Sequence, residues 1–127
     1  MEEKRNIIEL TDKNYNQIIK KGQCYLIDFY GKLCGPCGEL TPILEKLEPH
    51  ARKHNVVIAK CDIARNPKIT EYYGVESVPF TIFVNKEAKL VFPEIGLMDQ
   101  SVYAKGIEKV CDSHLSFFQR LFKKLKS

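Results

Sequence analysis

A run of seven residues, Cys24–Tyr30, constrains the fold of this chain more than any other segment. Apolar residues occupy both alternating sets of the run, whereas a strand with one face in water would alternate apolar and polar residues. The run therefore predicts a central strand in a sheet that is covered on both faces. Because 127 residues are a typical length for one domain, we expect a single such sheet.

The segments around this strand alternate between strand and helix patterns. Further strands are predicted over Asn6–Leu10, Val56–Cys61, Phe80–Val84 and Leu90–Ile95. A helix is expected between successive strands among the first four, a short turn joins the last two strands, and a final helix begins at about Met98. A helix between successive strands implies parallel pairing through right-handed crossovers, while the closing hairpin is antiparallel. The expected fold class is α/β, with a central mixed sheet of about five strands flanked by about four helices.

Polar and proline residues mark the expected helix ends. Thr11 or Asp12 can cap the first helix, and Asn66 followed by Pro67 is a good start for the third. Pro42 should kink the second helix, and Pro49 should divide it or end it before Asn55.

The charge balance bears on one class of function, nucleic-acid binding. Lysine and arginine number 20 against 16 acidic residues, a net charge of +4 that is dispersed along the chain and gives no support for nucleic-acid binding. The first residues lack the apolar segment of a signal peptide, so we expect a cytoplasmic protein. In that reducing compartment its five cysteines would default to free thiols.

Cys34-Gly35-Pro36-Cys37 directly follows the predicted central strand and opens a helix, the context in which a Cys-x-x-Cys pair becomes a redox site. Unpaired N–H groups and the dipole at a helix start stabilise an anion, so Cys34 can be a thiolate at neutral pH and act as a nucleophile. Structural or zinc-binding cysteines are the alternative. A zinc site needs four ligands, and the sequence has no second Cys-x-x-Cys; His50 and His54, which are four positions apart, are expected on a solvated helix face.

Two longer segments resemble the thioredoxin family. Ile27–Cys37 looks like the active-site strand and loop of that family, with an acidic residue six positions before the first cysteine, and Gly74–Phe80 looks like its cis-proline loop. Lys60, Pro42 and Gly96 also fall at family-like positions, and the resemblance covers roughly residues 6–111. It implies a thioredoxin fold and a protein disulfide reductase.

The resemblance assigns a role to each matching residue. Cys34 would attack a substrate disulfide and Cys37 would resolve the mixed disulfide, so that the pair alternates between dithiol and Cys34–Cys37 disulfide. Asp28, isolated in an apolar strand, would have a pKa raised by desolvation and accept the Cys37 proton, and Lys60 would tune that acid. The substrate groove would consist of Leu33, Gly35, Pro36, Val78, Pro79 in the cis form, Phe80 and Gly96.

Several positions depart from the family pattern. Tyr30 and Leu33 stand in the stretch where the family usually has tryptophan, and this chain contains none. Gly38 and Glu39 follow the second cysteine, where a basic residue is common, so we expect the Cys34 thiolate to be less stabilised than is usual. Phe80 replaces a threonine often found after the cis proline. These departures keep two alternatives open: a dedicated or more oxidising oxidoreductase, and a non-enzymatic binding module.

The resemblance also implies how the protein would be supplied and used. It would need no bound cofactor or metal, would take electrons from a separate thioredoxin-reductase-like donor, and would pass them to disulfide-containing client proteins, with cell redox homeostasis as its wider role. A monomer is expected.

The other three cysteines are predicted to be bystanders. Cys24 and Cys61 lie in predicted strands and should behave as small buried hydrophobes. Cys111 and His114 form an i, i+3 helical pair that could bind a metal, but two ligands are weak support and packing is the favoured reading.

The last residues extend beyond the usual end of the family. We expect residues 1–127 to form a single domain with a core of about 6–111 and a basic amphipathic helix over 112–127. Such a helix can lie on an anionic membrane or dock a partner, although packing of its apolar face on the domain is the commoner outcome.

Overall fold

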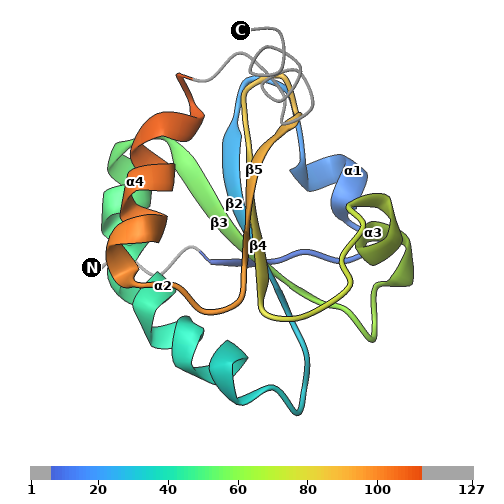
Figure 1. Cartoon of the computed structure of the whole chain (residues 1–127). Coiled ribbons are helices and arrows are strands. Elements are labelled where there is room, and N and C mark those ends of the chain that lie inside the picture. The colour runs from blue at the N-terminus through green and yellow to red at the C-terminus, as the bar shows by residue number, and fades with distance from the viewer. Residues whose placement is uncertain (1–6, 113–127) are drawn as a thin grey trace, which may run out of the picture.

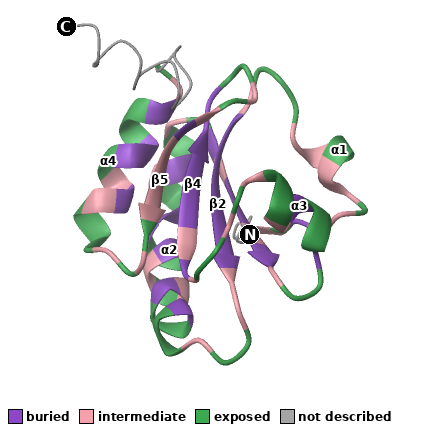
Figure 2. Cartoon of the chain, turned by 45° about the vertical axis from the view of Figure 1, so that its right-hand side comes forward, coloured by how far each residue is buried: buried purple, intermediate pink, exposed green. Residues whose placement is uncertain are grey.

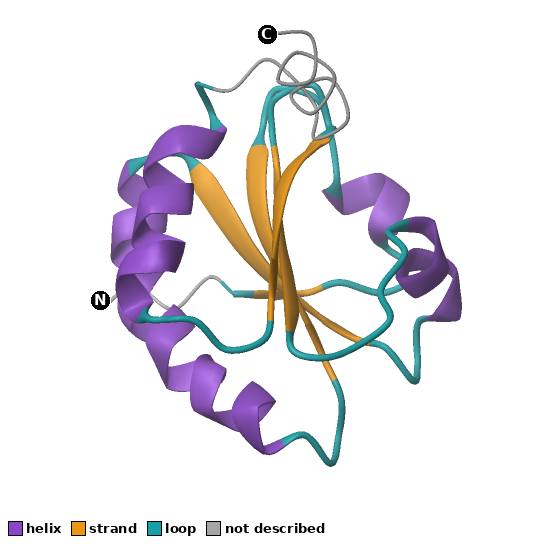
Figure 3. Ribbon diagram, in the orientation of Figure 1, coloured by secondary structure: helices purple, strands orange, loops and turns teal. Residues whose placement is uncertain are grey.

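The computed structural model describes residues 7–112, which form a five-stranded sheet in the order β1-β3-β2-β4-β5. Figures 1 and 3 show helices on both sides of this sheet. The strands are β1 (Ile8–Glu9), β2 (Cys24–Tyr30), β3 (Val56–Asp62), β4 (Phe80–Val84) and β5 (Leu90–Ile95), and the helices are α1 (Tyr15–Ile18), α2 (Gly35–Lys53), α3 (Pro67–Tyr72) and α4 (Gln100–Val110). The predicted element order, the central position of Cys24–Tyr30 and the mixed sheet are confirmed.

The expected parallel pairing is wrong at one connection. β1 and β2 both pair with β3 in parallel, but β4 pairs with β2 antiparallel although α3 lies between β3 and β4. Parallel pairing needs a connection that returns along the length of the strands, and the segment of residues 63–79, which contains α3, makes no such return. The chain therefore re-enters the sheet at the same end at which β3 leaves it.

Two apolar layers enclose the sheet. α2 and α4 cover one face, where Leu26, Leu44 and Ile107 are fully buried, and α1 and α3 lie over the other, where Ile27 and Phe29 are fully buried. In Figure 2 the strands are largely buried while the outer sides of the helices are exposed. Alternation along β2 turns Asp28 toward the α2 side, the same side as Leu26.

The helix caps differ from the prediction. α1 begins after Asn14, which makes no side-chain cap, and the Asp12 carboxylate instead accepts hydrogen bonds from the backbone N–H groups of Lys68 and Ile69 in α3. Asn66 does not cap α3 with its side chain; its amide accepts from the N–H of Asp12 and donates to the carbonyl of Asp62. The start of α3 is therefore capped by Asp12, which is distant in the sequence, and not by the adjacent Asn66.

The second helix tolerates its two prolines. α2 runs without a break past Pro42 and Pro49 to Lys53, so Pro49 does not divide it. Asn55, with φ of 61°, turns the chain sharply into β3.

The predicted basic helix over 112–127 and the Cys111–His114 pair involve residues 113–127, which lie outside the described part of the chain.

Candidate active site

Cys34 and Cys37 lie at the start of α2, at the end of the loop that follows β2. A disulfide joins them, with their Cα atoms 5.2 Å apart. Cys34 is the N-cap residue, and its sulfur accepts a hydrogen bond from the backbone N–H of Cys37 at 3.2 Å. Cys34 is half-buried, whereas Cys37 is only 4% exposed, so a reactant from solvent reaches the first sulfur more readily than the second.

Asp28 is a fully buried carboxyl in the middle of the sheet. Among the described residues, neither of its side-chain oxygens has a hydrogen-bond partner. Burial therefore raises the pKa of Asp28 from its ordinary value of 3.8 to about 7; the Lys60 charge opposes this shift, and Glu9 adds to it. A carboxyl with a pKa near neutrality can both take up and release a proton under cellular conditions.

Lys60 lies next to Asp28 across the sheet, because the two residues are register partners in β2 and β3. Its ammonium group donates a hydrogen bond to Thr41 Oγ1 in α2 at 2.9 Å and lies 4.8 Å from the centre of the Tyr30 ring. The Tyr30 hydroxyl donates to Glu9 at 2.8 Å. Tyr30 therefore packs beside Lys60 at the β1 side of the site, where it shields the lysine.

The sequence reasoning missed Thr81, which is the register partner of Asp28 on the other neighbouring strand, β4. Thr81 is fully buried, and its hydroxyl lies near that of Tyr103 without a well-aligned hydrogen bond to any residue in the described part of the chain. Lys60, Asp28 and Thr81 thus form one polar row across three strands beneath α2. The signal was available: Thr81 is a polar residue in an otherwise apolar strand, and it follows the conspicuous Pro79 by two residues.

The loop before β4 lies beside the loop that carries the cysteines. The Val78–Pro79 peptide bond is cis, and a Cβ atom at Gly31 would lie 3.4 Å from Val78 Cγ2. The carbonyl of Pro79 accepts a hydrogen bond from the N–H of Gly96 at 2.9 Å. Gly96 has φ of 86°, a left-handed conformation that suits glycine. The structure therefore gathers the cysteine loop, the proline loop and the end of β5 at one edge of the sheet.

Apolar side chains surround this edge. Leu33 is fully exposed, and Ile95, which the sequence reasoning did not select, is 61% exposed next to Gly96. Phe80 is half-buried, and its ring lies on the α1/α3 side of the sheet, 6.2 Å from the centre of the Phe29 ring, and not on the α2 side that holds Asp28. Gly35 and Pro36 are exposed in the first turn of α2. Exposed apolar residues around a reactive sulfur provide a surface on which a peptide segment can lie.

The cysteines predicted to be bystanders behave in two ways. Cys61 is buried and free, and burial is the main cause that raises its thiol pKa to about 12, which keeps it protonated. Cys24 is fully buried as expected, but the expectation of a free thiol is wrong, because a second disulfide joins it to Cys111. The two residues are 87 positions apart in the sequence, and only the packing of α4 against the start of β2 brings them together.

Two further observations limit the chemistry of the described residues. Within residues 7–112, no group of three or more histidine, cysteine, aspartate or glutamate side chains could hold a metal ion. None of the helices in this range is long and apolar enough to cross a membrane.

Comparisons with known proteins agree with the geometry. Residues 6–109 match the family named Thioredoxin. A thioredoxin of Chlamydia caviae is 43% identical over 91 residues, which cover 72% of this chain and 85% of the relative, and a thioredoxin of Chlorobaculum thiosulfatiphilum is 34% identical over 102 residues, covering 80% and 93%. The crystal structure of a thioredoxin from Malassezia sympodialis matches the fold with a TM-score of 0.76 at 21% identity, over 87% of this chain and 95% of the other.

Proposed function

The chain belongs to the thioredoxin family and acts in dithiol–disulfide exchange, and from this premise we propose that Cys34 and Cys37 carry out the exchange as a protein disulfide reductase. The observation that carries the proposal is the Cys34–Cys37 disulfide at the start of α2, on the strand end that also holds the buried Asp28. The two alternatives, a dedicated or more oxidising oxidoreductase and a non-enzymatic binding module, are not favoured by the comparisons.

Cys34 is the proposed nucleophile. In the reduced protein its thiolate attacks one sulfur of a client disulfide, forms a mixed disulfide, and releases the other client sulfur as a thiolate. The N–H of Cys37, which points at the Cys34 sulfur in the oxidised state, would stabilise the negative charge on that sulfur. The greater exposure of Cys34 supports its role as the first sulfur to react.

Cys37 is the proposed resolving residue. Its thiol gives a proton to Asp28, and the resulting thiolate attacks the Cys34 sulfur, which forms the Cys34–Cys37 disulfide and releases the second client sulfur. The client gains two electrons, and the cysteine pair loses them. A pKa of about 7 makes Asp28 suited to accept this proton, and Lys60 stabilises the carboxylate once the proton is transferred.

The loops beside the cysteines would hold the client. A short extended segment could lie along the backbone of Val78 and Pro79 as an added strand, with Leu33, Phe80 and Gly96 around it, and Gly35 and Pro36 below. Main-chain hydrogen bonds would then supply most of the affinity. Phe80 would meet the client through its backbone, because its ring packs on the α1/α3 side of the sheet.

We further propose a working context for the protein. Electrons would come from a separate thioredoxin-reductase-like donor, the clients would be disulfide-containing proteins, and the protein would act in the cytoplasm as a monomer that needs no bound cofactor. The need of the Cys34–Cys37 pair for continuous reduction supports a reducing compartment.

The test is the reduction of a protein disulfide, driven by dithiothreitol or by a reductase, with wild type, Cys34→Ser and Cys37→Ser. We expect wild type to be fast, and both variants to be as slow as the reaction without protein. Cys61→Ser is the matched control, because Cys61 is a free cysteine outside the pair, and it should keep the wild-type rate. A wild type no faster than Cys34→Ser would refute the proposal.

A second measurement assigns the order of attack. Cys37→Ser should accumulate a mixed disulfide between Cys34 and the client, which a nonreducing gel would separate, whereas Cys34→Ser should accumulate none. The opposite pattern would reverse the proposed roles of the two cysteines.

A further inference from the structure

The second disulfide lies at the opposite end of β2 from the first. Cys24 is the first residue of β2, and Cys111 is the residue that ends α4, with their Cα atoms 5.7 Å apart. Figure 1 shows the end of α4 and the start of β2 toward the top and the start of α2 at the bottom. Seven strand residues separate the two ends by about 20 Å, so the two disulfides cannot exchange directly within one molecule.

The two sulfurs of this second disulfide differ in access. Cys24 is fully buried in the apolar layer that includes Leu47, Ala51 and Val110, whereas Cys111 is half-buried. An external thiolate can therefore attack only the Cys111 sulfur, and the leaving group would be a Cys24 thiolate in apolar surroundings. Because such surroundings disfavour a thiolate, reduction should be slow.

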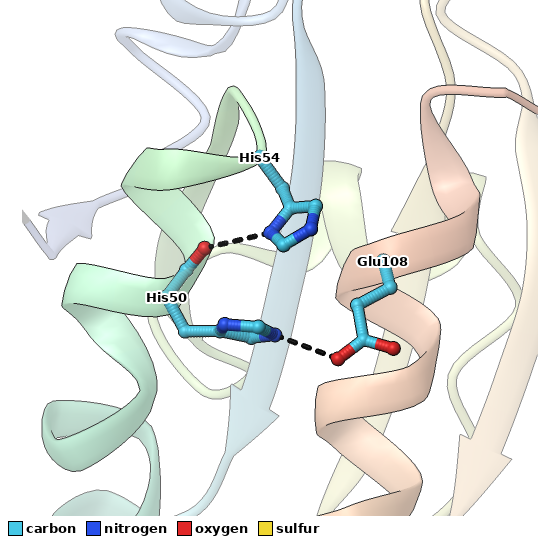
Figure 4. Close-up of polar contacts among 3 residues, drawn as sticks. All are labelled: His50, His54 and Glu108. Carbon is cyan, nitrogen blue, oxygen red and sulfur yellow. Dashed lines mark hydrogen bonds and ion pairs between the residues drawn. The ribbon is translucent and has the colours of Figure 1, made fainter.

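The disulfide also completes the attachment of α4 to the rest of the domain. His50 Nε2 in α2 lies 2.8 Å from the carboxylate of Glu108 in α4, and Figure 4 shows the two side chains meeting between the helices. The Cys111 sulfur lies 3.7 Å from the backbone oxygen of Asn55, in the turn that follows α2. The end of α4 is thus held to α2 by a polar contact and to β2 by a covalent bond.

We propose that Cys24 and Cys111 form a second redox site whose disulfide is a lasting clamp and takes no part in client exchange. The clamp closes when the two thiols pass two electrons and two protons to a low-molecular-weight disulfide, which becomes two thiols. It then stays closed while Cys34 and Cys37 cycle. The formation of this bond is independent of the proposed function, whereas its persistence through the cycle of Cys34 and Cys37 rests on that proposal.

The first experiment maps the bond in the full chain carrying Cys34→Ser and Cys37→Ser, which removes the other pair. The protein is exposed to oxidised glutathione, unfolded without reductant in the presence of an alkylating agent, digested and examined by mass spectrometry. We expect one cross-linked peptide pair containing Cys24 and Cys111, with the alkyl group on Cys61 alone. Alkylation of Cys24 and Cys111 under these conditions would overturn the proposal.

The second experiment measures how long the clamp survives in the wild-type protein. Folded, oxidised protein is treated with dithiothreitol, quenched with acid at intervals, and alkylated so that each cysteine is scored separately. We expect Cys34 and Cys37 to become free at least about tenfold faster than Cys24 and Cys111. Equal rates would overturn the clamp, and so would faster opening at Cys111; a failure of client reduction alone would not.

Discussion

The two ends of β2 carry the same kind of covalent bond in opposite surroundings. At the end of the strand, the Cys34–Cys37 disulfide joins residues three positions apart, with one half-buried sulfur and the buried carboxyl of Asp28 in the strand below. At its start, the Cys24–Cys111 disulfide joins residues 87 positions apart inside an apolar layer. We therefore attribute the different behaviour proposed for the two disulfides to the solvent exposure of their sulfurs and to the nearby carboxyl group, because both ends carry the same kind of bond.

The two ends of β2 also contribute differently to the stability of the domain. The active-site end contains the two buried carboxyl oxygens of Asp28, which have no hydrogen-bond partner among the described residues and cost free energy. The clamp end contains buried apolar groups and a cross-link over a long loop, which stabilise the fold. Changes at the first end should therefore stabilise the protein and lower its activity, whereas changes at the second should destabilise it and leave its activity nearly unchanged.

The largest expected effect comes from removing the clamp. Closing a loop of this length stabilises a protein by about 4 to 5 kcal/mol in the chain-entropy model. Cys24→Ala combined with Cys111→Ala should lower the free energy of unfolding by that order, measured by urea unfolding without reductant. The rate of client reduction at 25 °C should stay within about twofold of wild type, because both residues lie far from Cys34.

Cys61→Ala is the control for this loss of stability. It removes a buried sulfur that forms no disulfide, and it should cost only about 1 to 2 kcal/mol of packing. If the double variant lost no more stability than Cys61→Ala, the clamp would contribute nothing and the contrast between the two ends would fail.

Asp28→Asn should have the next largest effect, with the opposite sign. The folded-state pKa of about 7 lies above the ordinary value of 3.8, so between these values the folded protein holds a proton that the unfolded chain has released. Wild type therefore loses stability as the pH rises from about 4 to about 7, by on the order of 4 kcal/mol. Asparagine does not ionise, so the variant should escape this loss.

Urea unfolding at two pH values tests the sign. At about pH 8 Asp28→Asn should be more stable than wild type by that order, and near pH 4 the two should be close. Client reduction by the variant should be slower, because the variant lacks the proposed proton acceptor. Glu45→Gln, at an exposed position of α2, should change neither quantity. A stability difference that does not depend on pH would show that Asp28 is not a buried, titrating acid.

The sequence predicted the active-site end better than the clamp end, for a physical reason. Cys34, Cys37 and Asp28 lie within ten residues of one another on a strand, a loop and a helix start, so local pattern and spacing were sufficient to place them together. Cys24 and Cys111 meet only after α4 packs on the sheet, and nothing in their spacing indicates that contact.

The same limit explains the helix caps and the polar row. Asp12 reaches the start of α3 across more than fifty positions, while its local pattern suited a cap on α1. Thr81 becomes a neighbour of Asp28 only when β4 pairs antiparallel with β2, a pairing that the sequence reasoning assigned wrongly. The segments that form strands could be predicted from the sequence, but the contacts that depend on which strands pair with one another could not.

Lys60→Met sharpens the account of the active-site end by a smaller amount. The charge of Lys60 opposes the effect of burial on Asp28, so its removal should raise the Asp28 pKa further above its ordinary value. The pH at which stability falls should move upward equally, as followed by urea unfolding across the pH range. Lys46→Met, at an exposed position of α2, is the control. An unchanged pH profile in Lys60→Met would mean that the charge of Lys60 does not affect the pKa of Asp28.

The smallest expected effect concerns the charge beside the nucleophile. Glu39 is exposed in the second turn of α2, close to the helix start that favours a negative charge on Cys34. A positive charge there should stabilise the Cys34 thiolate, so Glu39→Lys should lower the Cys34 pKa and raise the thiolate fraction below that pKa by roughly two- to fivefold. The rate of alkylation of reduced protein by iodoacetamide, measured against pH, reports this change.

Glu45→Lys gives the matched control, because it makes the same charge change on the same helix about two turns further from the cysteine. Its profile should stay with wild type, since the effect of a charge falls off along the helix and is screened by salt. Equal shifts in both variants would point to net charge as the cause. A shift in Glu39→Lys alone, lost at high salt, would show that the departure from the family pattern at this position weakens the thiolate of Cys34.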